Sequence, residues 1–531
     1  MKSVSKGLAL AILAAAAGFF AVSIRAAPPP AFPFAEATID GLQARMRAGK
    51  LTAHELTAAY LDRIAAVDKA GPAINAIIEL NPDALDIADQ LDAERKAGHV
   101  RGPLHGIPIL IKDNIATLDR MQTTAGSLAL VGARPMHDAP LVTRLREAGA
   151  VILGKTNLSE WANFRSTIST SAWSGRGGLT RNPYALDRSP SGSSSGSAAA
   201  VAANLCVVAI GTETDGSIMS PSSVCGIVGV KPTVGLVSRT GIIPISVSQD
   251  TAGPMARTVR DAAIVLGVLA GVDRRDPATD ARPADRAADF SAALTPGALR
   301  GARLGIVRGP FRFHPRLDAV LDRAVAGLRA AGAEVIDPIE LATVTQLAAP
   351  EMEVMLYEFK AGINDWCLSL GANATVRSLA DLIAFDDSHR ESEMRYFGQE
   401  DFLRAQAKGP LTERAYLDAL ARCRQLARDD GIDAAMAANH LDALVALTNG
   451  PAMLADLVNG DRGTGSSSSA AAVAGYPSVT VPAASVMGLP VGISFFGSAW
   501  SEATLLAFAA DFEARTHARR EPQFLPTVAL P

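Results

Sequence analysis

Hydrophobic and polar positions along the chain form two kinds of pattern, short apolar runs and longer stretches with helical periodicity. The apolar runs are short and rich in Val, Ile and Leu, as expected for buried strands; they lie at residues 106–111, 150–153, 207–210, 303–307, 334–336, 443–447, 478–482 and 490–496. The helical stretches lie at residues 52–67, 82–97, 139–148, 198–204, 257–271, 316–331 and 501–516, with mostly helical sequence over 345–430. Thr52 and Glu55 have the spacing of a capping box, which marks a helix start.

Strands and helices alternate along most of the chain, and no change of composition divides it. This order predicts an α/β fold, with a largely parallel or mixed central sheet covered by helices on both faces. The Asp-, Arg- and Pro-rich stretch 273–296 has no periodicity and is expected to be a long surface connection. We therefore expect one large domain over residues 36–531.

The first residues have the pattern of a secretory signal. Two lysines precede 18 uncharged residues, Gly7–Ile24, and small residues then lead into three prolines. The run just reaches the length of an uncleaved membrane anchor, which is the alternative. Its alanine-rich composition favours a cleaved signal peptide at residues 1–27, followed by a Pro-rich linker at 28–35. The expected mature protein is exported, periplasmic or secreted, without stable membrane insertion.

Composition excludes several other classes of protein. The chain is 48% hydrophobic and 20% charged, which is too apolar for a disordered chain. Its formal net charge of −4, without a basic patch, argues against a nucleic-acid partner. The four cysteines, Cys206, Cys225, Cys367 and Cys423, are too few for a disulfide scaffold, and whether any pair form is open.

One motif imitates a nucleotide-binding loop. Gly149–Thr156 matches the pattern G-x-x-x-x-G-K-[ST] letter for letter. A phosphate-binding loop needs a flexible turn that leads from a strand into a helix. Here the four central residues are Ala, Val, Ile and Leu, which are the strand itself, so we reject nucleotide binding.

A second motif, Gly192–Gly196, matches the nucleophile elbow G-x-S-x-G with Ser194 at its centre. The residues before it are turn-like and not an apolar strand, which argues against this interpretation. Histidines downstream leave a Ser-His-Asp site open on composition alone. The eight histidines are scattered, without the close spacing of a metal site, so no metal is expected.

Two Ser/Gly-rich segments and one lysine carry more specific chemistry. The segments are Ser191–Ser197 and Gly211–Ile218, both within one of the most apolar parts of the chain, where a flexible linker is out of place. Lys112 directly follows the apolar run that ends at Ile111. Such a lysine can extend its ammonium to water. If it is buried instead, desolvation lowers its pKa and makes a neutral amine available as a base.

These segments resemble the amidase signature family. The similarity rests on several separate motifs in the same order, and within the family the form GTETDGS and the signal sequence are most similar to bacterial peptide amidases. The motifs are GIPILIKDNI (106–115), SGSSSGS (191–197), GTETDGSI (211–218), CGIVGVKPT (225–233), QDTAGPMART (249–258), GYPSVTVPA (475–483) and GLPVGISFFG (488–497). The resemblance implies an α/β/α fold around a mixed sheet, with no cofactor and no metal.

The family pattern also implies a catalytic site. Its catalytic lysine falls on Lys112, its bridging serine on Ser193 and its nucleophile on Ser217. The oxyanion-hole amides fall on Thr214, Asp215, Gly216 and Ser217. Glycines 192, 196 and 216 fit a backbone that needs close approach or unusual torsions.

This chain departs from the family pattern at a few positions. Ser191 and Ser195 stand where the family usually has Gly, which is harmless if the local φ is negative. Asp215 replaces another frequent Gly, and its carboxylate either recognises substrate or anchors the loop. Met219 takes the place of a frequent Arg, which leaves the triad intact.

The resemblance implies a serine hydrolase of carboxylic amides that works through an acyl-enzyme and deamidates peptide C-terminal amides. The alternatives are an exported amidase for aryl or fatty acyl amides, an amidotransferase component that passes ammonia to a partner enzyme, and a non-catalytic binding protein. The expected partner is a small-molecule or peptide amide. The substrate and the oligomeric state are open, and residues 345–430 are expected to wall the pocket.

Overall fold

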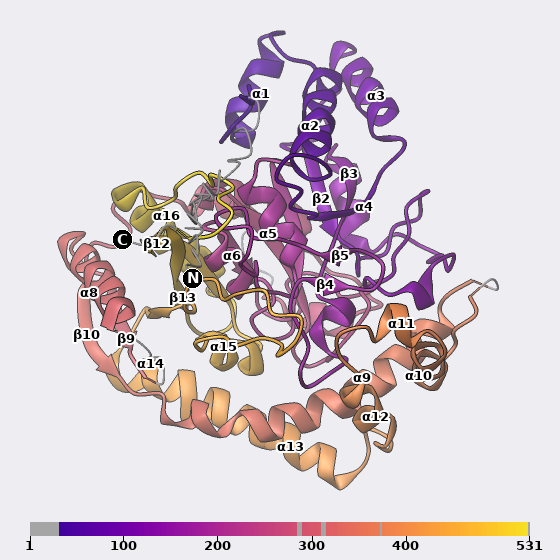
Figure 1. The fold of residues 1–531 in the computed structure, drawn as a ribbon. Coiled ribbons are helices and arrows are strands. Elements are labelled where there is room, and N and C mark those ends of the chain that lie inside the picture. Colours follow the sequence, from indigo (N-terminus) through magenta and orange to yellow (C-terminus); the bar gives the residue numbers. More distant parts are fainter. Residues whose placement is uncertain (1–30, 284–288, 310–314, 372–373, 529–531) are drawn as a thin grey trace, which may run out of the picture.

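An 11-stranded sheet runs through the computed structural model, which describes residues 31–283, 289–309, 315–371 and 374–528 (Figure 1). The predicted signal peptide, residues 1–27, and the start of the linker lie outside the described residues. The strands are β1 (Ile77–Leu80), β2 (Pro108–Lys112), β3 (Val151–Thr156), β6 (Val208–Glu213), β7 (Val228–Lys231), β8 (Thr251–Ala256), β9 (Arg303–Val307), β10 (Glu334–Ile339), β11 (Ala443–Leu447), β12 (Ser478–Val486) and β13 (Leu489–Phe496). A separate two-stranded ribbon pairs β4 (Trp173–Ser174) with β5 (Gly178–Leu179).

The sheet is mixed, with the strand order β1-β3-β2-β6-β8-β7-β12-β13-β11-β9-β10. β2 is parallel to both β3 and β6, and β9 is parallel to both β10 and β11. All other neighbouring strands in the sheet are antiparallel. The expected single α/β domain with a mixed sheet flanked by helices is confirmed.

Helices pack along the sheet and also build a band beyond it. The helices are α1 (Ile39–Arg47), α2 (Ala53–Val67), α3 (Ala84–Lys96), α4 (Pro140–Glu147), α5 (Ser195–Ala202), α6 (Met219–Val224), α7 (Val259–Leu269), α8 (Pro315–Ala330), α9 (Ala348–Leu368), α10 (Leu379–Ser388), α11 (Arg390–Glu393), α12 (Glu400–Gln406), α13 (Arg414–Arg424), α14 (Asp433–Asn439), α15 (Ser468–Ala474) and α16 (Glu502–Thr516). α5 packs on β2, β3 and β6, and α7 packs on β7 and β8. The band of α9–α13 curves along the opposite end of the molecule from α1–α3 (Figure 1).

Most predicted elements are confirmed, because their apolar periodicity reflects real burial. Every residue of β2, β3, β6, β11 and β13 is buried. The capping box of Thr52 and Glu55 starts α2 as expected. Residues 345–430 are mostly helical, as predicted.

Three strands of the 11-stranded sheet, β1, β7 and β8, were not predicted, and neither was the short ribbon of β4 and β5. β8 contains Gly253 and Pro254, which normally argue against a central strand because proline lacks an N–H. The strand is nevertheless compatible with the sheet, since its ladder with β7 involves only Met255 and Ala256. Pro254 therefore lies beyond that ladder, opposite Ile210 of β6.

A buried ionic cluster joins the helical band to the rest of the domain. The Arg165 guanidinium lies 2.7 Å from Glu160, 3.8 Å from Glu393 of α11 and 4.0 Å from Asp386 of α10. All four side chains are almost fully buried. Burial raises the pKa of all three carboxyl groups, that of Asp386 to about 7. One cation is thus shared among three carboxyl groups that favour their protonated form.

Within the described part of the chain, no helix combines the length and apolar character needed to cross a membrane. The four cysteines are free and buried.

Candidate active site

A cavity of ≈ 530 Å³ lies where the turn after β6, the loop before α5 and the helical band meet. One wall is polar and contains Ser193 and Ser217. Another is apolar and includes Phe164, Ile245 and Met352. As expected, the helical segment supplies part of the wall, with residues Glu351, Met352, Met355 and Asp401.

Lys112 is the last residue of β2 and is fully buried. Its Nζ donates hydrogen bonds to Ser193 Oγ at 2.7 Å, to Thr212 Oγ1 at 2.8 Å and to the Thr212 carbonyl at 3.2 Å. Burial lowers the pKa of Lys112 to about 7, although the carboxylates of Asp250 and Glu213 oppose that shift. The amine is therefore available in its neutral form near neutral pH, in contact with a serine hydroxyl.

Backbone hydrogen bonds hold the Ser193 segment against the Ser217 segment on one side and against Ser159 on the other. The Ser194 N–H donates to the Ser217 carbonyl at 3.1 Å, and the Ser159 N–H donates to the Ser193 carbonyl at 3.1 Å. Within the same segment, Gly196 in α5 lies so close to a neighbouring stretch of backbone that a Cβ would be 2.2 Å from the Ala76 carbonyl oxygen. A larger residue there would push the serine segment away from its place.

The expectation of a harmless negative φ is wrong for Ser191. This residue adopts φ +62°, in the left-handed region that glycine occupies without strain. Its carbonyl accepts a hydrogen bond from Ser195 Oγ at 2.7 Å, and its N–H donates to Ser189 Oγ at 3.0 Å. These local bonds hold the loop in a conformation that costs a non-glycine residue about 1–2 kcal/mol. Ser195 itself is the first residue of α5.

Ser217 lies in a tight turn between β6 and α6. Gly216 before it has φ +77°, a conformation that explains glycine at this position. The Glu213 carboxylate, at the end of β6, accepts hydrogen bonds from the backbone N–H of Ile218 at 2.6 Å and of Met219 at 2.9 Å. The same carboxylate thereby fixes the backbone directly after Ser217.

The backbone amides of residues 214–217 are available for a ligand. Among the described residues, no group accepts a hydrogen bond from these N–H groups. Thr214, Asp215 and Ser217 also line the cavity. The loop is anchored on its other side, where Thr214 Oγ1 donates to Asp250 at 2.6 Å. Burial raises the pKa of Asp250 to about 6.

Asp215 meets a second carboxyl group on the cavity wall. Its Oδ2 accepts a hydrogen bond from Ser469 of α15 at 2.6 Å, and its carboxyl is in hydrogen-bonding contact with Glu351 of α9. Burial and the neighbouring Asp215 charge raise the pKa of Glu351 well above its ordinary range. Gln249 Nε2 donates to Glu351 Oε1 at 2.9 Å. The arrangement is that of a protonated Glu351 beside Asp215.

The structure thus brings Lys112 and Ser193 into direct contact and places Ser193 and Ser217 on one cavity. In the described residues, no hydrogen bond joins the two serine side chains. Ser194, the centre of the elbow motif, is fully buried and its hydroxyl exchanges hydrogen bonds with the Thr212 backbone. No histidine is among the residues that line the cavity. Met219 is buried in α6 and does not line the cavity.

Several residues that hold this site were not predicted from the sequence: Thr212, Glu213, Asp250 and Glu351. The first three lie inside or beside the recognised motifs, so their polar side chains between buried positions were a usable signal. Glu351 lies on a helix without any motif and had no such signal.

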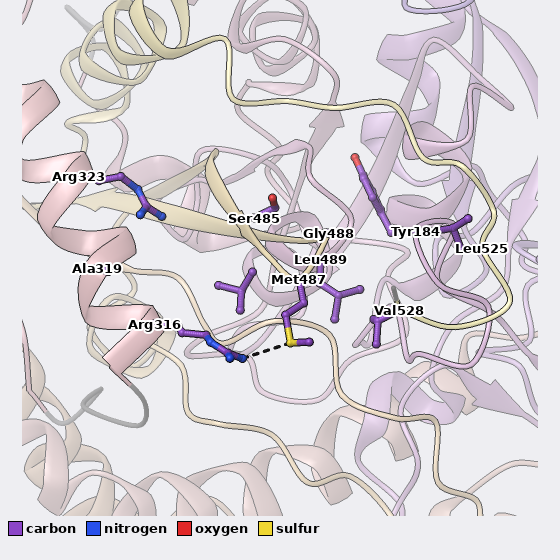
Figure 2. A pocket seen from close by; sticks show the side chains of 11 residues that line it. Tyr184, Arg316, Ala319, Arg323, Ser485, Met487, Gly488, Leu489, Leu525 and Val528 are labelled. Atoms are coloured by element: carbon purple, nitrogen blue, oxygen red, sulfur yellow. Dashed lines mark hydrogen bonds between the residues drawn. The ribbon is translucent and has the colours of Figure 1, made fainter. Parts of the chain in front are cut away.

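The other chemical interpretations find little support in the described chain. Gly154, Lys155 and Thr156 of the nucleotide-loop motif lie within strand β3, and Lys155 is buried. In the described ranges, no group of three or more His, Cys, Asp or Glu side chains could hold a metal ion. A second cavity of ≈ 610 Å³, mostly apolar with Arg316 and Arg323 at one side, shares no lining residue with the first (Figure 2).

Comparisons with known proteins agree with this geometry. The family model described as Amidase matches residues 55–506. The native peptide amidase from Stenotrophomonas maltophilia is similar in structure, with a TM-score of 0.89 and 55% identity over 93% of this chain and 100% of that one. A probable amidase of Arabidopsis thaliana is 42% identical over 93% of each chain. A glutamyl-tRNA(Gln) amidotransferase subunit from Chloroflexus aurantiacus is 37% identical over 88% of this chain and 94% of that one.

Proposed function

The chain belongs to the amidase signature family and is an amide-hydrolysing enzyme, and on this premise we propose that it uses a Ser217–Ser193–Lys112 triad to release ammonia from the C-terminal carboxamide of peptides. The observation that carries the proposal is the buried contact of 2.7 Å between Lys112 Nζ and Ser193 Oγ beside the cavity that Ser217 lines. A serine hydroxyl needs such a base before it can attack an amide.

The first step is a proton relay. Neutral Lys112 takes the proton of Ser193, and Ser193 takes the proton of Ser217 as Ser217 Oγ attacks the carbonyl carbon of the substrate. This forms a tetrahedral intermediate whose negative oxygen is held by the backbone N–H groups of residues 214–217. Each well-placed donor of this kind contributes roughly 10²–10³ in rate. Their lack of protein acceptors in the described structure supports this role.

The second step breaks the C–N bond. The relay returns a proton through Ser193 to the leaving nitrogen, so ammonia departs and Ser217 becomes an acyl ester. Water then attacks the ester carbonyl, gives its proton to the relay and releases the free acid together with the Ser217 hydroxyl. Ser193 contacts both Lys112 and the cavity, which suits a group that acts as base and then as acid.

The peptide substrate is supported by two observations. The structurally similar protein with 55% identity is a peptide amidase. The cavity is large enough for an amino-acid residue and combines an apolar wall with polar groups near the nucleophile. Aryl and fatty acyl amides, which lack peptide N–H groups, are the alternative substrates.

Mass spectrometry tests the function directly. Purified protein is incubated with amidated peptides, aryl amides and fatty acyl amides, and each product is compared with the authentic acid. We expect conversion of peptide amides to peptide acids, and none with the Ser217→Ala variant. Turnover of aryl or acyl amides alone would replace the peptide assignment, while conversion undiminished in Ser217→Ala would refute the triad.

The amidotransferase alternative rests on the relatives that carry this name. In that function the ammonia passes to a partner enzyme that acts on charged tRNA. Export would separate the protein from tRNA and ATP, and the peptide amidase shares more identical residues with this chain. Co-purification of the protein from its own cells with further components of such a complex would favour the amidotransferase.

We also propose that the protein is exported after cleavage near residue 27. The proposal rests on the charged, apolar and small-residue pattern of the first residues. N-terminal sequencing of the protein recovered outside the cytoplasm tests it, because a mature chain that starts close to Pro28 is expected. A full-length chain that stays with the membrane fraction would favour the uncleaved anchor.

A further inference from the structure

Asp215 and Glu351 form a pair of carboxyl groups on the wall of the catalytic cavity, and the proposed reaction does not use their side chains. A charged carboxylate two residues before the nucleophile opposes the negative charge that develops on the substrate oxygen. Such a group is tolerated only if another group compensates its charge. The hydrogen bonds of the pair show which groups compensate the charge of Asp215.

Two groups outside the pair donate hydrogen bonds to it, and a third hydrogen bond lies between its two carboxyl groups. Ser469 of α15 donates to Asp215 Oδ2, Gln249 donates to Glu351 Oε1, and the protonated Glu351 carboxyl donates to Asp215. Asp215 Oδ1 is buried, and no N–H or hydroxyl group of the described chain donates to it, so it accepts only from the Glu351 carboxyl or from a ligand. A buried carboxylate oxygen without a full set of donors bears an uncompensated desolvation cost, so a donor from the ligand is favoured.

The position of the pair indicates which part of a substrate supplies that donor. In the proposed reaction the leaving nitrogen must face Ser193, which returns its proton. Ser193 contacts Lys112 at the end of β2, whereas the Asp215 carboxyl contacts α9 and α15. The pair is therefore directed toward other elements than those that carry Lys112 and Ser193, and it is suited to the acyl part of the substrate.

We propose that Asp215, positioned by Glu351, accepts a hydrogen bond from the N–H that an N-acylated amino-acid amide carries on its α-carbon. This contact makes Asp215 a specificity-determining residue that selects peptide amides over simple carboxamides. The inference rests on the proposed function, since it assigns a role to the acyl side of the same cavity. Glu351 is a positioning residue, because it acts through Asp215.

The test compares two substrates that differ only in the acylamino group. N-acetylphenylalaninamide carries the α-N–H, and 3-phenylpropanamide lacks it. The ratio of their kcat/KM values cancels any loss of folded or active enzyme. We expect a high ratio for the native enzyme and a drop of about 10- to 100-fold in Asp215→Ala, as for a hydrogen bond to a charged acceptor.

Glu351 variants separate positioning from mere packing. Gln at position 351 keeps an oxygen for Gln249 and supplies an N–H to Asp215, as the protonated carboxyl does, so Glu351→Gln should keep the ratio. Glu351→Ala removes both the oxygen for Gln249 and the donor for Asp215, so it should lower the ratio. The matched control is Asp401→Asn, which removes another carboxylate from the same cavity wall and should leave the ratio unchanged.

Several outcomes would overturn the inference. An unchanged ratio in Asp215→Ala would do so, as would an equal drop in Asp401→Asn or in Glu351→Gln. If Asp215→Ala instead loses the discrimination between the primary amide and its N-methylamide, the Asp215 contact lies on the leaving nitrogen. If Asp215→Ala loses more activity with phenylalaninamide than with N-acetylphenylalaninamide, the Asp215 carboxylate binds an ammonium group. If the native enzyme hydrolyses neither substrate, the proposed function fails first; if it hydrolyses both equally well, only this inference fails.

Discussion

The burial of Lys112 predicts how the activity depends on pH. An ordinary lysine, with a pKa near 10.5, has only about 3 in 10,000 of its amines neutral at pH 7. Burial lowers the pKa of Lys112 to about 7, so about half of the amines are neutral at that pH. Desolvation thus increases the population of the base by about 10³-fold.

The expected profile follows from this population. Below about pH 7, kcat/KM should fall about tenfold for each pH unit, because the amine becomes protonated; above about pH 8 it should level off. The assay measures kcat/KM for a peptide amide from about pH 5 to about pH 9. Lys112→Arg, which keeps the charge but stays protonated, should lose at least about 10³-fold at every pH.

Two further variants identify the group that titrates. The Asp250 carboxylate opposes the lowered pKa of Lys112, so Asp250→Asn should move the acid limb of the profile to lower pH. If the limb belonged to Asp250 itself, this variant would abolish it. The matched control is Lys155→Met at the neighbouring strand, because burial also lowers the pKa of Lys155, to about 8, but this lysine does not line the cavity.

Four results would refute the reasoning. A flat profile would remove the titrating base, and an acid limb near the ordinary lysine pKa would show a solvated amine. Substantial activity in Lys112→Arg would show that no neutral amine is needed. A loss of the limb in Lys155→Met would assign the titration to Lys155 instead.

Other predictions concern the nucleophile, its support and the buried ionic cluster. A fluorophosphonate probe should label Ser217, as peptide mapping would show, and labelling at Ser194 would restore the elbow interpretation. Glu213→Gln should lower kcat roughly 10- to 100-fold with little change in KM, because the turn after the nucleophile loses a charged acceptor; an unchanged kcat would contradict this. The Asp386 carboxyl titrates near 4 when unfolded and about 7 when folded, so its contribution to stability is lost as pH rises through that range. Asp386→Asn should therefore stabilise the protein more at about pH 8 than at about pH 5, by roughly 1–3 kcal/mol in denaturant unfolding, and an equal effect at both would refute the shift.

The local pattern was sufficient for most of the sheet and for the outline of the site. Strands such as β2, β3 and β11 are buried on both faces, so their sequences are continuous apolar runs that are recognisable without any neighbour. β8 was not recognisable, because its Gly and Pro are acceptable only where the ladder with β7 ends. Local propensity therefore failed where a neighbouring strand decided the outcome.

The same division holds for the candidate site. The sequence alone made candidates of Lys112, because it directly follows an apolar run, and of the serine segments, because Gly and Ser interrupt apolar surroundings; their catalytic roles came from the family resemblance. It could not distinguish Ser193 from Ser194 by physical means, since adjacent residues point in different directions only once the backbone is folded. The structure directs Ser193 to the Lys112 amine and Ser194 to the Thr212 backbone.

What the sequence by itself determined is thus the set of chemical groups and the buried strands that carry them, since residue type and periodicity are local properties. Only the tertiary structure decided which groups meet. It placed Glu351 of α9 beside Asp215 and enclosed Lys112 so completely that its pKa falls to about 7. Hydrogen bonding and desolvation depend on distances and on burial, and residues far apart in the chain create both.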